Sequence, residues 1–119
     1  MKAAFSATDG LLVTRLTDID QNGQATLVST GWAQASLPPP YTRNVTVTPG
    51  QARDYDIEIW PTDWRFLAGH KLQLSISSGD VPRTMPVAPP GNVTVYTGDG
   101  GSTVTLPVLG AAPAGTSAR

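Results

Sequence analysis

Apolar and polar side chains alternate with a period of two along most of this chain, and that pattern limits the fold more than any other feature. The clearest case is the segment HKLQLSISS, in which successive side chains fall on opposite faces of an extended strand. One face of this segment carries His70, Leu72, Leu74 and Ile76. The segments that alternate are 11–19, 25–35, 44–48, 52–60, 70–78, 92–98 and 102–109. No stretch sustains a helical period, and the one candidate helical turn is 62–67, so the sequence predicts an all-β protein.

Turn-forming residues separate the predicted strands. Asn22-Gly23 lies between the first two alternating segments and is typical of a type I′ hairpin turn, which needs positive φ at both central residues. Three consecutive prolines at 38–40 cannot donate to a strand ladder and indicate a crossing at the surface. Four prolines in 79–91 predict a long loop. Short strands at these spacings indicate an antiparallel β-sandwich or jelly roll.

The composition limits the partners that the chain can have. The length of 119 residues suits one domain, which we expect at 1–109, followed by a disordered tail at 110–119. A net charge of −1 without a basic block argues against nucleic acid and against an anionic membrane surface. No apolar run reaches the ~20 residues of a membrane span, and no apolar stretch typical of a signal peptide follows the N-terminus, so a cytoplasmic location is favoured. The absence of cysteine excludes disulfides and thiolate metal sites.

The single histidine, His70, raises the question of a Ser-His-Asp active site. Such a site needs a hydroxyl within hydrogen-bond reach of the ring. Ser75 and Ser77 lie on the strand face opposite His70, and the chain contains no G-x-S-x-G sequence. We therefore expect a packed, hydrogen-bonded histidine and assign no catalytic residue.

A second hypothesis is a calcium loop at 18–25, DIDQNGQA. Asp18, Asp20 and Asn22, followed by Gly23, match the start of such a loop. However, the position of the bidentate glutamate is occupied by Ser29, and strands rather than helices flank the segment. A β-hairpin explains the same residues, so we assign no metal and no cofactor.

A third hypothesis is a sugar site formed by exposed aromatic residues. Trp60 and Trp64 lie close to the end of a predicted strand, where an indole ring could stack on a sugar. Trp32 shares a strand face with Val28, which favours the core. A carbohydrate-binding module is therefore the alternative to a structural role.

A longer motif surrounds these residues. The stretch 58–83, EIWPTDWRFLAGHKLQLSISSGDVPR, resembles one in the C-terminal domain of the X-Pro dipeptidyl-peptidase and cocaine-esterase-like serine hydrolases. The run 11–36, LLVTRLTDIDQNGQATLVSTGWAQAS, is similar to a strand–turn–strand of the same domain, and the resemblance extends over about 4–109. The motif positions to which the resemblance gives a structural role are Trp60, Pro61, Thr62, Phe66, Gly69, His70, Pro82 and Arg83.

The resemblance implies a jelly roll of the galactose-binding-like kind. In such enzymes this domain follows an α/β-hydrolase domain, which holds the entire catalytic triad and cleaves a peptide bond after proline, an ester or an acyl amide. The accessory domain would brace the hydrolase domain and help to wall its substrate pocket. We expect 79–91 to contact that partner domain or subunit, and the alternative is that this loop is a simple crossover between strands.

The resemblance also implies that further strands normally precede the first residues of this chain. We therefore expect an N-terminally truncated sandwich, whose open sheet edge would favour self-association. The third class, an independently active hydrolase, lacks support from any motif.

Overall fold

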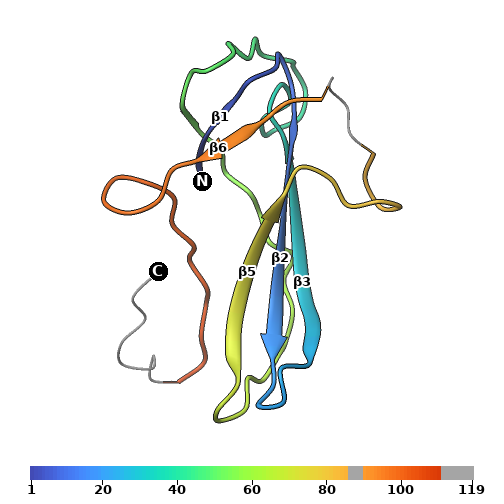
Figure 1. The fold of residues 1–119 in the computed structure, drawn as a ribbon, viewed down its shortest axis with the longest axis vertical. Helices are drawn as coiled ribbons and strands as arrows, with labels where there is room; N and C mark the ends of the chain where they lie inside the picture. Colours follow the sequence, from blue (N-terminus) through green and yellow to red (C-terminus); the bar gives the residue numbers. More distant parts are fainter. Residues whose placement is uncertain (86–89, 111–119) are drawn as a thin grey trace.

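The computed structural model describes residues 1–85 and 90–110 and shows two antiparallel sheets of three strands each (Figure 1). The strands are β1 (Lys2–Phe5), β2 (Leu11–Ile19), β3 (Ala25–Gln34), β4 (Arg53–Asp54), β5 (Lys71–Ser77) and β6 (Val93–Val95). The small sheet has the order β4-β1-β6, and the large sheet has the order β3-β2-β5. The described residues form no helix that is long and apolar enough to cross a membrane. The predicted all-β sandwich is confirmed, while its jelly-roll connectivity stays a prediction.

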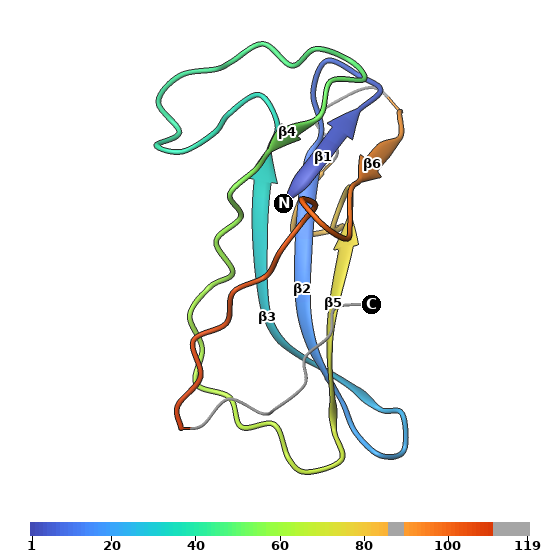
Figure 2. The same ribbon diagram turned by 90° about the vertical axis from the view of Figure 1, so that its left-hand side faces the viewer.

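The core lies between the two sheets, where small side chains allow close packing. Ala3 and Phe5 of the small sheet pack with Leu12 and Ala33 of the large sheet. The ring of Phe5 meets that of Tyr55 edge to face, with centroids 5.6 Å apart. Figure 2 shows that the small sheet covers only one end of the large sheet. The other end, near the β2–β3 turn, depends on contacts other than this core.

The β2–β3 hairpin has the predicted strands but a different turn. The amide of Gly23 donates to the carbonyl of Asp20, and the amide of Asp20 donates to the carbonyl of Gln24. Within this fully described turn only Gly23 has a positive φ, of 82°. The prediction of a type I′ turn is therefore wrong. The turn is of the three-residue kind, in which a glycine follows a type I turn. One carboxylate oxygen of Asp20 accepts hydrogen bonds from the amides of Asn22 and Gln24, which stabilises this longer loop.

The segment after β4 runs along the edge of β3 without forming a regular ladder. The amide of Trp60 donates to the carbonyl of Thr30 over 2.9 Å, and the hydroxyl of Ser29 donates to the carbonyl of Trp60 over 2.6 Å. Gly31 makes this approach possible, because a Cβ atom there would overlap the carbonyl oxygen of Glu58. Gly31 therefore allows the segment around Glu58 to pack closely against β3.

Several expected strands are absent or shortened. The segment 52–60 keeps its alternation, with Tyr55 buried, but only Arg53–Asp54 form a ladder because the partner β1 is short. The segments 44–48 and 102–109 are not strands, since neither has a neighbouring strand to pair with over its length. Val104 and Val108, expected to face inward, are exposed.

Other expectations were also wrong at the level of single elements. Strand β1 was not predicted, because KAAF lacks alternation, and 62–67 forms no helical turn. Strand β6 is shorter than the predicted 92–98, although Val93 and Val95 are the more buried side chains as expected. The predicted tail at 110–119 lies outside the described residues except for Gly110, as does the part of the predicted loop at 86–89.

Asp9 holds the β1–β2 turn against the end of β3. Its carboxylate accepts hydrogen bonds from the amides of Gly10 and Ser36, from the hydroxyl of Ser36 and from the side-chain amide of Gln34. Burial acts to raise the pKa of Asp9, but these hydrogen bonds outweigh it and hold the pKa below its ordinary value of 3.8. The charged form is therefore the one that the fold stabilises.

Replacing Gly31 by alanine tests the close approach. The added methyl group would push the segment of Glu58 away from β3, and we expect a loss of roughly 1–3 kcal/mol in the free energy of unfolding. Urea unfolding measures this loss. Thr26→Ala, on the exposed end of the same strand, is the control and should cost less than about 0.5 kcal/mol. Equal effects of the two substitutions would contradict the close-packing argument.

The lowered pKa of Asp9 predicts a pH dependence of stability. A depressed pKa in the folded state adds stability that is present above the unfolded value and is lost as the pH falls through the folded one. We expect Asp9→Asn to cost about 1 kcal/mol at neutral pH, and the difference from the natural protein to shrink as the pH falls below about 4. Ser36→Ala should give an intermediate profile. Parallel profiles in urea unfolding at several pH values would rule this mechanism out.

Candidate functional site

The carboxylate of Asp18 joins three segments at the end of the large sheet that the small sheet leaves uncovered. One oxygen accepts a hydrogen bond from Nδ1 of His70 over 2.9 Å, and the other accepts one from Nε1 of Trp64 over 3.0 Å. Asp18 is only 5% exposed, and His70 is half-buried. Because a carboxylate can only accept, the ring carries a proton on Nδ1. We call Asp18, Trp64 and His70 the Asp18 junction.

The strand register explains why these residues meet. Asp18 lies directly opposite Leu72 in the β2–β5 pair, and His70 precedes Leu72 by two residues, which places it diagonally across from Asp18. A turn in which the amide of His70 donates to the carbonyl of Leu67 brings the ring into position. Gly69 permits that turn with a φ of 81°.

The serines of β5 are turned away from the Asp18 junction. Ser75 pairs with Arg15 and Ser77 with Val13, so both side chains lie on the sheet face opposite Asp18. The hydroxyl of Ser77 donates to the carbonyl of Gly79. Among the described residues no hydroxyl is hydrogen-bonded to His70. The arrangement thus holds a carboxylate and an imidazole, as a triad does, but offers the ring no nucleophile.

Both carboxylates of the proposed calcium loop make other contacts in the structure. Both oxygens of Asp18 already accept hydrogen bonds within the Asp18 junction, and Asp20 caps the hairpin turn. In residues 1–85 and 90–110 no three His, Cys, Asp or Glu side chains gather as metal ligands would. The Asp18 junction and the hairpin turn therefore account for Asp18 and Asp20, respectively.

A second buried carboxylate fixes the loop after β5. Asp80 is buried and forms an ion pair with Arg15 of β2, and its other oxygen lies 3.5 Å from a guanidinium nitrogen of Arg83. The amide of Thr84 donates to the carbonyl of Asp80, which closes the loop. Figure 1 shows this part of the chain crossing from β5 towards β3. The motif residue Arg83 is thereby held over the large sheet.

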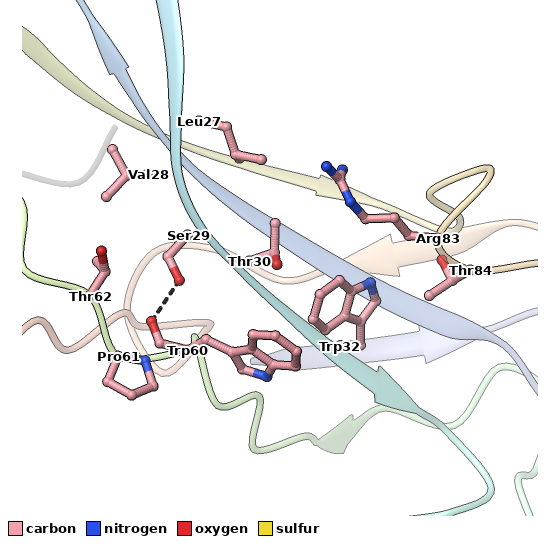
Figure 3. Close-up of a pocket in the computed structure, with 10 residues that line it drawn as sticks. All are labelled: Leu27, Val28, Ser29, Thr30, Trp32, Trp60, Pro61, Thr62, Arg83 and Thr84. Atoms are coloured by element: carbon pink, nitrogen blue, oxygen red, sulfur yellow. Dashed lines mark hydrogen bonds between the residues drawn. The ribbon is translucent and has the colours of Figure 1, made fainter.

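A groove lies where this loop meets the edge of β3. Figure 3 shows the ring of Trp32 beside that of Trp60, and their centroids are 5.1 Å apart at an interplanar angle of 71°. The groove has a volume of about 610 Å³. It is lined by Leu27, Val28, Ser29, Thr30, Trp32, Trp60, Pro61, Thr62, Arg83 and Thr84. We call it the tryptophan groove.

The predicted motif residues divide between these two places. Trp60, Pro61, Thr62 and Arg83 line the tryptophan groove, whereas Gly69 and His70 belong to the Asp18 junction. Phe66 is half-buried in the segment between them, and Pro82 is exposed in the loop.

The two sugar-site candidates do not lie together. Trp60 is 62% exposed in the tryptophan groove, whereas Trp64 donates its indole proton to Asp18 and is not among the groove's lining residues. Trp32, which was expected in the core, is half-buried and forms a wall of the groove.

Sequence reasoning missed Asp18 and Asp80 as buried carboxylates. For Asp18 a signal existed, because it follows Leu12, Thr14 and Leu16 on the inward face of β2, where an acid requires a partner. For Asp80 no such signal exists, because it lies in a loop whose path depends on the ion pair with Arg15.

Comparison with known families matches residues 1–112 to the X-Pro dipeptidyl-peptidase C-terminal non-catalytic domain. Searches of curated proteins and of solved structures gave no match. The match includes both the Asp18 junction and the tryptophan groove.

Removing the carboxylate of the Asp18 junction should destabilise the domain. Asp18→Ala leaves the imidazole and the indole N–H without their acceptor, and we expect a loss of roughly 2–4 kcal/mol in the free energy of unfolding. Asp56→Ala, an exposed acid, is the matched control and should cost less than about 0.5 kcal/mol. Chemical denaturation followed by tryptophan fluorescence measures both. A cost for Asp18→Ala no greater than that of the control would show that the junction is not structural.

Proposed function

The chain belongs to the family of X-Pro dipeptidyl-peptidase C-terminal non-catalytic domains, and we propose that this accessory domain braces an α/β-hydrolase domain and helps to wall its substrate pocket. The proposal assigns the catalytic triad to the partner domain. The whole enzyme would cleave a peptide bond after proline, or an ester or acyl amide, through an acyl-enzyme intermediate.

The Asp18 junction supports a structural role for His70. Its ring is anchored through Nδ1 to a buried carboxylate, and that carboxylate also holds Trp64. The hydroxyls of Ser75 and Ser77 lie on the other face of the sheet. We therefore propose that His70 ties the turn before β5 to the end of β2 and does not act as a base.

The single observation that carries the docking proposal is the apolar loop after β5. Val81 and Met85 are 68% and 69% exposed. The backbone that carries them is nevertheless fixed, because the buried Asp80 pairs with Arg15 and its carbonyl accepts a hydrogen bond from the amide of Thr84. Exposed apolar side chains on an anchored backbone are typical of a surface that meets a partner. We propose that this loop contacts the hydrolase domain, in keeping with the expectation for 79–91.

The inward face of β5 is a second candidate contact surface, on the face of the large sheet opposite the one to which Arg15 holds the loop after β5. Leu72 and Ile76 are 45% and 39% exposed although they lie on the same face as the buried Leu16. The alternation predicted that this face would be buried. The exposure of Leu72 and Ile76 shows that the described residues cover it only in part. Either the hydrolase domain or a second copy of the chain could cover it, and the experiment below separates the two.

Binding to an α/β-hydrolase domain tests the proposal. The purified chain is mixed with the hydrolase domain of an X-Pro dipeptidyl-peptidase, and association is followed by light scattering after gel filtration. We expect a complex of one chain and one hydrolase domain with a raised melting temperature. The double substitution Val81→Asp, Met85→Asp should weaken it by about tenfold or more. Tyr41→Asp, in another loop and similarly exposed, is the control.

Three outcomes would contradict the proposal. They are the absence of a complex, equal weakening by the control, and assembly of the chain only with itself. Turnover of an X-Pro anilide or a p-nitrophenyl ester by the isolated chain, abolished by His70→Ala, would contradict the structural role of His70.

A further inference from the structure

Strand β5 is the outermost strand of the large sheet, and one of its two edges has no partner among the described residues. The sheet order β3-β2-β5 leaves that edge of Lys71–Ser77 open, and every residue of the strand except Leu74 is exposed (Figure 2). Natural sheets usually protect an open edge with a proline, a bulge or a central charge. β5 contains no proline, pairs with β2 without a register shift, and carries its one charge, Lys71, at its first position. The edge is therefore available to another strand.

The hydrogen bonds of β2 show which backbone groups of β5 face the open edge. The amide of Ala35 donates to the carbonyl of Gly10, directly beyond the Leu11–Gln34 pair. In an antiparallel ladder the hydrogen-bonded pairs alternate, so the even-numbered residues of β2 direct their N–H and C=O groups to β3 and the odd-numbered residues direct theirs to β5. The residues of β5 that lie opposite these odd-numbered residues are Lys71, Gln73, Ser75 and Ser77.

The N–H and C=O groups of Leu72, Leu74 and Ile76 consequently point to the open edge. The side chains of the same three residues lie on the inward face, where Leu72 and Ile76 are 45% and 39% exposed. Donors and acceptors that recur at every second residue of an extended backbone are completed by an added strand. Residues 1–85 and 90–110 supply no such strand.

The sequence of β5 is complementary to itself about Leu74. When a second copy runs antiparallel, Leu74 lies opposite Leu74 and Leu72 lies opposite Ile76, so apolar side chains meet on one face. Lys71 falls opposite Ser77, so no like charges meet. This is also the antiparallel register that pairs all three residues whose backbone groups face the open edge, each pair exchanging two hydrogen bonds.

We propose that the chain forms a two-fold dimer in which β5 pairs antiparallel with β5 of a second copy, centred on Leu74. The pairing occupies the same edge in both copies. The other edge of the large sheet is shielded, because the amide of Trp60 donates to the carbonyl of Thr30 in β3. The assembly therefore closes at two copies and does not extend into a filament.

The dimer is independent of the proposed hydrolase contact through the loop after β5. A single pair of short strands gives a small interface, and we expect a dissociation constant on the order of 10–100 µM. Well below that concentration the chain is a monomer, on which the hydrolase contact can be measured. Failure of the dimer would leave the accessory role untouched.

Sedimentation equilibrium over a concentration series tests the inference. Between about 1 µM and about 1 mM we expect the mass to rise from that of one chain to that of two. Leu74→Pro removes an N–H that faces the open edge and spares the ladder with β2, and it should weaken the dimer by about tenfold or more. Leu74→Ala, which shortens the same side chain but keeps the N–H, is the matched control and should weaken it less.

Cysteine trapping tests the register and does not require Leu74→Pro to fold. The chain has no cysteine, so each introduced thiol is unique. Leu74→Cys brings two cysteines opposite each other and should form an intermolecular disulfide under mild oxidation. Ile76→Cys alone should not, because the two cysteines would be offset by about 13 Å along the strands. A mixture of Leu72→Cys and Ile76→Cys chains should link.

A mass of one chain at every concentration would overturn the dimer, and so would unchanged dimerisation of a folded Leu74→Pro chain. Linking of Ile76→Cys as fast as Leu74→Cys would overturn the two-fold register. A chain that binds the hydrolase domain but never a second copy would retain its accessory role and lose this one.

Discussion

The buried carboxylate of Asp18 is the interaction on which one end of the large sheet depends. The small sheet packs over Leu12 and Ala33 and leaves the region of the β2–β3 turn without a second layer. There the chain substitutes a polar contact for an apolar core, because Asp18 binds a side chain from each of two segments outside β2. The side-chain amide of Gln21 adds to this by donating to the carbonyl of Ala68. A polar junction of this kind is stabilising only while every buried group keeps its partner.

The same geometry explains why a chain with serine, histidine and aspartate close in sequence need not hold a triad. A triad requires the hydroxyl and the imidazole on one side of the strand, whereas the pleat turns Ser75 and Ser77 away from His70. The sequence was sufficient for this conclusion, since it needs only the two-residue period. It was not sufficient to identify Asp18 as the partner of the ring, because that contact depends on how β2 and β5 are aligned.

Local pattern predicted those elements whose hydrogen-bond partners are also long strands. The segments 11–19 and 25–35 became β2 and β3 almost residue for residue, and 70–78 became β5 with one residue fewer at each end. Alternation failed as a guide at 102–109, which forms no strand and belongs to neither sheet. It also failed at Lys2–Phe5, which is a strand because β4 and β6 flank it and not because of its own pattern. A ladder is a property of two segments, and a single segment does not reveal it.

The central claim is that His70 is held by Asp18 and is therefore structural, and the protonation site of its ring tests this most directly. Long-range proton–nitrogen correlation spectra of the neutral imidazole distinguish a proton on Nδ1 from one on Nε2. Because Asp18 accepts from Nδ1, the account predicts the Nδ1–H form, and it predicts that Asp18→Ala loses that preference. An Nε2–H ring in the natural chain, with Nδ1 free to accept a proton, would contradict it.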